Sequence, residues 1–341
     1  MKNEIFAGQV VSVSGLKVHF PIRKGVFGKI AGNVKAVDDV SFTINRGEIF
    51  AIVGESGCGK TTTAQAILGL VHKTSGEINL SIGKWRTSAA QWEKLSPKER
   101  RDLRQHIQVV FQDPYGSLDP RMTVRSIIEE PLVIHGIANG KERLQRIDEL
   151  LNQVGLSKEY LTRYPHEFSG GQRQRIGIAR ALATNPELII ADEPVSALDV
   201  SIQAQIINLL QDLQIKHRQT QLFISHDLAV VRQMANRLAV MYQGRICETG
   251  TEHQVFTNPL HPYTRLLLDS VPLPGKGRSS RGLTTAVTEE KDTVQLDNCC
   301  LFYPRCNRRK KECFESKPEI KDLEKGHAVA CFNPLAGSDL S

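Results

Sequence analysis

The sequence predicts an α/β fold in which parallel strands carry the functional loops. Three short apolar segments, residues 48–53, 187–191 and 221–225, have the length and composition of buried strands. The first of them ends at a glycine-rich loop, and residues 62–70 beyond this loop are predicted to form a helix. Apolar residues recur every three or four positions over 202–213, which predicts a second packed helix. Strands and helices in this order are typical of an α/β sheet.

The composition is that of an ordinary globular chain. Of its 341 residues, 40% are hydrophobic and 24% are charged, as in soluble folded proteins. No segment approaches the roughly 18 uninterrupted apolar residues that a membrane helix needs, and the start at Met1 shows no secretory signal. The net charge of +7 is modest for this length and indicates a mixed, solvated surface, so no nucleic-acid partner is expected. We expect the protein in the cytosol unless a partner holds it at the membrane.

Residues 54–61 match the spacing G-x-x-x-x-G-K-[ST] between the first strand and its helix. Glycines let the backbone curl so that N–H groups point at phosphate oxygens, and the helix adds its positive N-terminal end. Lys60 is expected to reach the β- and γ-phosphates, and Thr61 to bind Mg²⁺ through its hydroxyl. Cys58 is interpreted as a small filler rather than a nucleophile. The expected nucleotide contacts in this segment are Gly54, Ser56, Gly57, Cys58, Gly59, Lys60, Thr61 and Thr62.

Two acidic residues end the second predicted strand, and a histidine ends the third. Asp192 at the strand tip is suited to the Mg²⁺ hydration shell. Glu193 points to the other side of the chain, where a carboxylate can act as general base toward an attacking water. His226 follows the third strand and is placed to contact the γ-phosphate. A single histidine after a strand is often structural, so its role is open from the residues alone.

The segment 168–175, Phe-Ser-Gly-Gly-Gln-Arg-Gln-Arg, resembles the signature of ATP-binding-cassette ATPases, in which leucine usually stands where this chain has Phe168. Its serine and glycines begin a predicted helix, whose N–H groups form a second anion site. In that family this site faces the ATP bound by the other subunit, so two chains close on two nucleotides before hydrolysis. The resemblance implies that this contact is made by Ser169, Gly170, Gly171 and Gln172.

Further elements of the family pattern occur in the same order along the chain. Gln112 resembles the glutamine that senses Mg²⁺ and water, and Asp199 belongs to a segment that resembles the loop crossing the dimer interface. Phe20 is the first candidate to stack on adenine, with Phe27 as an alternative. The resemblance extends over residues 10–340 and supports a catalytic role for His226.

The resemblance also implies the domain organisation. We expect a P-loop NTPase cassette over residues 1–270 with an inserted, mostly helical subdomain at about 84–180. Residues 271–297, rich in Pro, Gly, Ser, Thr and charge, are interpreted as a linker. A small cysteine-rich extension is expected over 298–341.

Two segments, 113–124 and 261–267, resemble the peptide and nickel importer branch of this family. Other details resemble the F-type subunit of an oligopeptide or dipeptide permease. This implies an ATPase at the cytoplasmic face of the membrane, bound peripherally to two transmembrane permease subunits. It also implies a heterodimer with a second, D-type ATPase and an extracytoplasmic peptide-binding protein. Peptide is the expected cargo, with nickel chelate or glutathione as alternatives.

Two rival functions remain beside transport. A non-transport ATPase of the same superfamily usually has two fused cassettes or a long coiled-coil arm, and this chain has one cassette and neither feature. An iron–sulfur regulator would use nucleotide only as a signal. The joint presence of Glu193, Gln112 and His226 argues against a purely sensory site.

Five of the seven cysteines follow residue 298, which suggests a metal site. Four of them have the spacing C-x5-C-x6-C-x17-C: Cys300, Cys306, Cys313 and Cys331. Four thiolates can bind zinc or a [4Fe–4S] cluster, and the lack of close cysteine pairs typical of zinc sites favours iron–sulfur. The family resemblance likewise implies [4Fe–4S]. Free thiols remain an alternative, and the adjacent Cys299 leaves the first ligand open.

Overall fold

The computed structural model describes most of the chain, namely residues 8–24, 29–88, 92, 94–270 and 298–335. Three predicted features lie outside these residues: the linker 271–297, the alternative adenine contact Phe27, and the end of the extension at 336–341.

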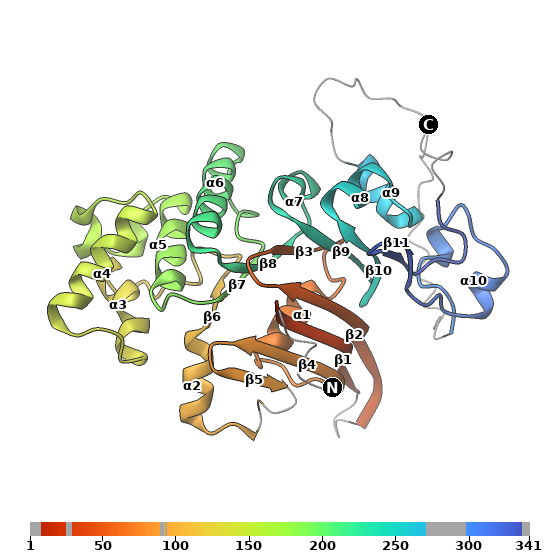
Figure 1. Cartoon of the computed structure of the whole chain (residues 1–341), viewed down its shortest axis with the longest axis horizontal. Coiled ribbons are helices and arrows are strands. Elements are labelled where there is room, and N and C mark those ends of the chain that lie inside the picture. The colour runs from red at the N-terminus through yellow and green to blue at the C-terminus, as the bar shows by residue number, and fades with distance from the viewer. Residues whose placement is uncertain (1–7, 25–28, 89–91, 93, 271–297, 336–341) are drawn as a thin grey trace.

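A mixed sheet of eight strands, counted over the described residues, forms the centre of the molecule (Figure 1). In sheet order the strands are β11 (Lys321–Glu324), β12 (His327–Val329), β10 (Arg245–Thr251), β9 (Arg237–Tyr242), β3 (Ile49–Val53), β8 (Thr220–Ser225), β7 (Leu188–Asp192) and β6 (Ile107–Val110). Strands β9, β3, β8, β7 and β6 run parallel, whereas β10, β12 and β11 add to one edge in antiparallel fashion. The predicted α/β class is confirmed.

The parallel strands are apolar along their whole length because both faces of the sheet are covered. In β3, Ile49, Ala51 and Val53 point into one hydrophobic cluster, and Phe50 and Ile52 point into the other. The first cluster includes residues of helices that follow in the chain, such as Val124, Ile176 and Ile206, and the second includes residues of the N-terminal strands, such as Val11 and Ile44. Burial on both faces therefore fixes each strand along its own direction, and with it the point at which the following loop begins.

A smaller antiparallel sheet covers the second cluster. Its strand order is β2 (Lys29–Asn45), β1 (Gln9–Lys24), β4 (Ser75–Ile82) and β5 (Trp85–Ser88). Helix α1 (Lys60–Ile67) packs against β1 and β2 and contributes Ala64 and Ile67 to this cluster. The phosphate-binding segment thus lies between the two sheets.

The predicted helical segment at 84–180 contains strands as well as helices. Strand β6 lies within it and belongs to the large sheet, since its Ile107 and Val110 are buried there. The helices in this part of the chain are α2 (Pro97–Gln105), α3 (Val124–Ile134), α4 (Gly140–Gln153) and α5 (Gly170–Leu182). Figure 1 shows α3, α4 and α5 grouped at one end of the molecule, so the mainly helical part begins after β6.

The remaining helices complete the cover of the large sheet and form part of the extension. They are α6 (Val200–His217), α7 (Leu228–Met234), α8 (Glu252–Thr257), α9 (Pro262–Asp269) and α10 (Glu312–Glu315). In the part of the chain that the structure describes, no helix combines the length and apolar character needed to cross a bilayer.

The cysteine-rich extension continues the large sheet. Strand β12 pairs with β10 through Glu248 opposite Val329 and Thr249 opposite Ala328. Glu248 and His327 are both fully buried, and His327 Nε2 lies 2.7 Å from Oε1 of Glu248. The Glu248 carboxylate also accepts hydrogen bonds from the backbone N–H groups of Leu260 (2.9 Å) and His261 (2.8 Å). One buried carboxylate therefore joins β10, the start of α9 and the extension.

Replacing Glu248 with alanine should lower the free energy of unfolding by about 3–5 kcal/mol, because three buried hydrogen-bonding groups lose their acceptor. Urea unfolding measures this change. Glu252→Ala is the matched control, since it removes only the half-exposed ion pair with Arg232 and should cost less than about 1 kcal/mol. Equal effects of the two substitutions would contradict the role given to Glu248.

Candidate functional site

The phosphate loop connects β3 to α1 and has a backbone that only glycine can adopt at two positions. Gly54 has φ 151° and Gly59 has φ 106°. A Cβ atom would lie 2.1 Å from the Met241 carbonyl oxygen at Gly54, and 2.2 Å from the Ala36 carbonyl oxygen at Gly59. Helix α1 has no side-chain cap at its N-terminus. The start of α1 thus presents backbone N–H groups that no side chain caps, as an anion site requires.

Lys60 lies buried beneath this loop. Its Nζ atom donates to the carbonyl oxygens of Gly54 (2.9 Å) and Glu55 (3.0 Å). The same ammonium lies 3.9 Å from Oε1 of Glu193, and only 4% of the residue is exposed. The backbone of the loop therefore fixes the position of the cation before any ligand binds.

Asp192 ends β7 beside the start of α1. The Thr61 hydroxyl donates to Oδ1 of Asp192 at 3.1 Å. Burial raises the pKa of the Asp192 carboxyl, the hydrogen bond from Thr61 lowers it, and the charge of Glu193 raises it further. Adjacent hydroxyl and carboxylate oxygens are the ligands that Mg²⁺ prefers. Thr61 and Asp192, which the sequence predicts to bind Mg²⁺, thus lie in contact.

Glu193 follows in a left-handed backbone conformation, with φ 47°. Its N–H donates to the Ile224 carbonyl oxygen at 2.9 Å. Gln112 Nε2 donates to Oε2 of Glu193 at 3.0 Å, and His226 Nδ1 lies 3.1 Å from Oε1. A left-handed non-glycine residue costs about 1–3 kcal/mol and is typical of functional sites. Through the two side-chain contacts, Gln112, Glu193 and His226, which are predicted for catalysis, lie together.

The signature segment lies elsewhere in this single chain. Ser169 caps α5, accepting from the Gln172 N–H at 3.4 Å, while Gln172 accepts from the Ser169 N–H at 3.1 Å. A Cβ atom on Gly171 would lie 2.3 Å from Ile202, so the turn packs against the start of α6. Asp199 caps α6. Among the described residues, no hydrogen bond or ion pair joins the start of α5 to the phosphate loop.

Two aromatic residues were singled out in the sequence. Phe20 lies in β1 opposite Val34 and is 42% exposed, which leaves its ring accessible to a ligand. Phe168 is buried and packs edge-on against Tyr160, with 5.3 Å between ring centroids. The residue that departs from the usual signature leucine therefore fills a hydrophobic core position.

Two contacts to the phosphate loop were not predicted from the sequence. The Glu55 N–H donates to the Tyr263 hydroxyl at 3.1 Å. Arg305, 250 residues further along the chain, donates to both carboxylate oxygens of Glu55 at 3.0 Å each. Because these partners are distant in sequence, no local pattern could indicate them.

The four spaced cysteines of the extension influence one another. Burial, together with the neighbouring thiols of Cys306 and Cys313, raises the pKa of Cys300 and of Cys331 to about 11 each. Burial also raises the pKa of Cys299, and the positive charge of Lys317 lowers it in part. The Cys299 thiol in turn raises the pKa of Cys300, so the two neighbouring thiols interact.

No group of three or more His, Cys, Asp or Glu side chains within the described ranges is arranged to hold a single metal ion. The thiols do have backbone donors: the Lys310 N–H donates to Cys313 Sγ and the Asn333 N–H to Cys331 Sγ, each at 3.4 Å. The pKa of Cys300 and of Cys306, raised mainly by burial, is lowered in part by hydrogen bonds from Phe302 and Arg308.

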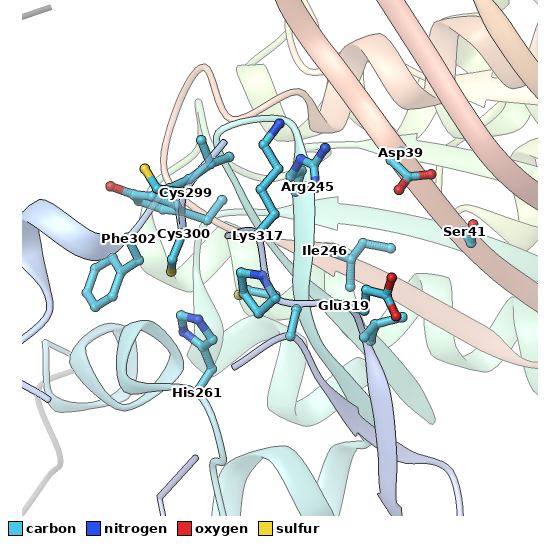
Figure 2. A pocket seen from close by; sticks show the side chains of 16 residues that line it. Asp39, Ser41, Arg245, Ile246, His261, Cys299, Cys300, Phe302, Lys317 and Glu319 are labelled. Carbon is cyan, nitrogen blue, oxygen red and sulfur yellow. The ribbon is translucent and has the colours of Figure 1, made fainter. Parts of the chain in front are cut away.

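A cavity of about 460 Å³ is lined by residues of both the extension and the body of the protein (Figure 2). Its lining includes Asp39 and Arg245 of the body, Cys300 and Lys317 of the extension, and His261 at the start of α9. It contains none of the residues predicted to bind nucleotide.

Comparison with protein families gives two matches. Residues 37–196 match the ABC transporter model, and residues 247–313 match the model for the oligopeptide/dipeptide transporter C-terminal region.

Curated relatives match over nearly the whole chain. It is 50% identical to the oligopeptide transport ATP-binding protein AppF of Bacillus subtilis (strain 168), over 94% of this chain and 96% of that protein. It is 42% identical to the dipeptide transport ATP-binding protein DppF of Haemophilus influenzae, over 98% of this chain and 99% of that protein. The glutathione import ATP-binding protein GsiA of Escherichia coli O157:H7 is 52% identical over 80% of this chain, which spans 43% of that protein.

Among solved structures, a dimeric ATP-binding cassette in a post-hydrolysis state with ADP and Pi is similar. It has a TM-score of 0.60 and 31% identity, and the match covers 71% of this chain and 98% of that one. Together with the loop geometry, these similarities show that the chain is an ABC transporter ATPase that carries the C-terminal region of the oligopeptide/dipeptide transporters.

Proposed function

We propose that this ATPase energises the import of peptides through a membrane permease. The observation that carries the proposal is the convergence of Lys60, Asp192, Glu193, Gln112 and His226 beside the glycine-rich loop 54–61. The named relatives that match almost the full chain are peptide transport proteins, which supports peptide as the cargo.

In this proposal the loop residues 54–62 bind the phosphates of ATP. Lys60 binds the β- and γ-phosphates from its fixed place under the loop. Thr61, Asp192 and Gln112 hold Mg²⁺, which offsets the negative charge that develops on the transferred phosphoryl group. The adjacent oxygens of Thr61 and Asp192, 3.1 Å apart, support this assignment. Phe20 stacks on the adenine.

Glu193 acts as the general base. Its carboxylate takes a proton from water while the water oxygen bonds to the γ-phosphorus and the bond to the ADP oxygen breaks. The hydrogen bond from Gln112 and the contact with His226 fix the direction of the carboxylate and of the water beside it. The left-handed backbone at Glu193 supports a functional position, since such strained residues are typical of active sites.

Hydrolysis also requires a second ATPase. The start of α5 presents Ser169, Gly170, Gly171 and Gln172 with N–H groups suited to an anion, and Asp199 lies on a loop packed beside it. The similar solved cassette is a dimer bound to ADP and Pi, which supports pairing. We propose that the partner is an unlike, D-type ATPase and that each signature segment closes on the nucleotide of the other subunit.

Helices α3–α5 are proposed to form the helical subdomain that contacts the permease. Exposed apolar side chains on and beside these helices support a partner surface: Phe111, Tyr115, Val133, Ile134, Leu144 and Tyr164. The working assembly then has two permease subunits, two ATPases at the cytoplasmic face of the membrane, and an extracytoplasmic peptide-binding protein.

Glutathione is the second candidate cargo, because the identity to the glutathione import protein is as high as that to the peptide relatives. This similarity covers less than half of that protein's length. A nickel chelate has no comparable support. Glutathione is itself a tripeptide, so both candidates belong to one chemical class.

We further propose a [4Fe–4S] cluster on Cys300, Cys306, Cys313 and Cys331. Four thiolates can hold one such cluster, with one thiolate bound to each iron. The N–H donors to the thiols support thiolate ligands, and Arg308 and Arg309, which lower the pKa of Cys306, offset the negative charge.

Glu193→Gln should retain ATP binding and lower hydrolysis by at least about 100-fold, because the base is lost while the phosphate contacts stay. Lys60→Ala should instead weaken ATP binding itself. Both should abolish uptake of a labelled peptide by the reconstituted transporter. Wild-type turnover in Glu193→Gln would remove Glu193 from its role, and uptake of glutathione without other peptides would replace the proposed cargo.

Anaerobically purified protein should contain about four iron atoms per chain and show the broad visible absorbance of an iron–sulfur cluster. Cys313→Ser should lose both signals. The control Cys299→Ser should keep them, because Cys299 lies outside the proposed ligand set. One zinc per chain, or loss of iron in the control, would contradict the ligand assignment.

A further inference from the structure

Glu55 is the second residue of the phosphate loop, and its N–H, its carbonyl oxygen and its carboxylate all make contacts that fix that loop. Its N–H donates to the Tyr263 hydroxyl at 3.1 Å, and its carbonyl oxygen accepts from Lys60 Nζ at 3.0 Å. Its carboxylate accepts two hydrogen bonds from Arg305. One residue thus links the phosphate-binding lysine to helix α9 and to the cysteine-rich extension.

The pair with Arg305 is stronger than an ordinary surface ion pair. Most exposed ion pairs contribute little, but a bidentate guanidinium–carboxylate pair with both distances at 3.0 Å is the favourable exception. The Arg305 side chain is 27% exposed. Its guanidinium lies over the rings of Tyr242 and Phe302, 5.8 Å from each centroid. These rings limit the directions in which Arg305 can point.

The aromatic platform is continuous with the body of the protein. The rings of Tyr242 and Tyr263 lie 4.6 Å apart, and Phe302 lies 5.4 Å from Tyr242 and 5.5 Å from Tyr263. Figure 2 shows Phe302 and Cys300 on the segment of the extension next to His261, whose ring is 5.6 Å from that of Phe302. The extension is therefore packed against α9 and β9 directly beside the loop.

The backbone around Arg305 belongs to the cysteine element. Residues Tyr303–Arg305 form one 3-10 turn, with the Tyr303 N–H bonded to the Cys300 carbonyl oxygen and the Cys306 N–H to the Tyr303 carbonyl oxygen. The Cys300 N–H in turn donates to the Cys313 carbonyl oxygen at 2.8 Å. The fold of the cysteine element thus determines where Arg305 lies.

An acidic residue in a loop that binds phosphate is electrostatically unfavourable unless it is neutralised. With Arg305 in place, the charge of Glu55 is paired and its carboxylate is turned toward the extension. Without Arg305, an unpaired carboxylate would lie in the same loop as the bound anion and repel it.

We propose that Arg305 is a positioning residue of the nucleotide site: it pairs with Glu55 and so makes ATP affinity depend on the folded cysteine-rich extension. The residue does not touch ATP, and the proposal does not depend on which metal the cysteines bind. It adds to the ATPase site a residue from outside the cassette.

ATP affinity of the purified full-length chain tests this proposal, with a fluorescent ATP analogue displaced by ATP as the probe. Arg305→Ala should weaken ATP binding about tenfold, the effect of losing a charge-assisted pair, with a smaller change in kcat. Lys311→Ala is the matched control, because Lys311 is an exposed cation of the same element that pairs with Glu315 and not with Glu55. It should bind ATP as the wild type does.

The double variant Glu55→Gln/Arg305→Ala should recover ATP affinity, since no unpaired carboxylate remains. A purely structural role of Arg305 would not give this rescue. Arg305→Lys keeps the charge without the two parallel bonds and tests the same point if the alanine variant fails to fold; it should bind ATP with intermediate affinity. Wild-type affinity in Arg305→Ala or Arg305→Lys, or failure of Glu55→Gln to rescue, would overturn the proposal.

Discussion

The alignment of the carboxyl ends of three parallel strands is the constraint on which the whole site depends. Val53 of β3 pairs with Ser225 of β8, and Ile224 of β8 pairs with Asp192 of β7. These registers bring the phosphate loop, the histidine segment and the acid pair to one edge of the sheet. A shift by one residue would turn alternate side chains to the opposite face, so burial on both faces fixes the register and with it the distances between Lys60 and the acidic residues.

Much of this site could be predicted from the sequence because its parts are local. A short apolar strand followed by glycines and a lysine predicts a phosphate loop, and one followed by two acidic residues predicts a metal ligand and a base. Lys60, Asp192 and Glu193 were predicted in this way. The strand β6 inside the expected helical segment was missed, since four residues with two buried positions give almost no periodic signal. The signature segment was recognised only by resemblance, and its function depends on a second chain.

The extension shows what local patterns leave out. Its strands β11 and β12 are short, and all four residues of β11 are exposed, so neither resembles a buried strand in sequence. The contacts that nevertheless join it to the cassette include the pairing of β12 with β10, the buried pair Glu248–His327, and the pair Arg305–Glu55. Each joins residues more than 75 positions apart, and only folding brings them together. The extension is consequently part of the ATPase structurally, not an independent appendage.

The most direct test of the account is a structure of the chain with Mg²⁺ and a non-hydrolysable ATP analogue. We predict that the phosphates lie in the loop 54–61, with Lys60 Nζ in hydrogen-bond contact with them and the metal beside Thr61 and Asp192. Glu193 should face the γ-phosphate, and Arg305 should remain paired with Glu55. Phosphates bound outside this loop, with Lys60 contacting only the carbonyl oxygens of Gly54 and Glu55, would contradict the account.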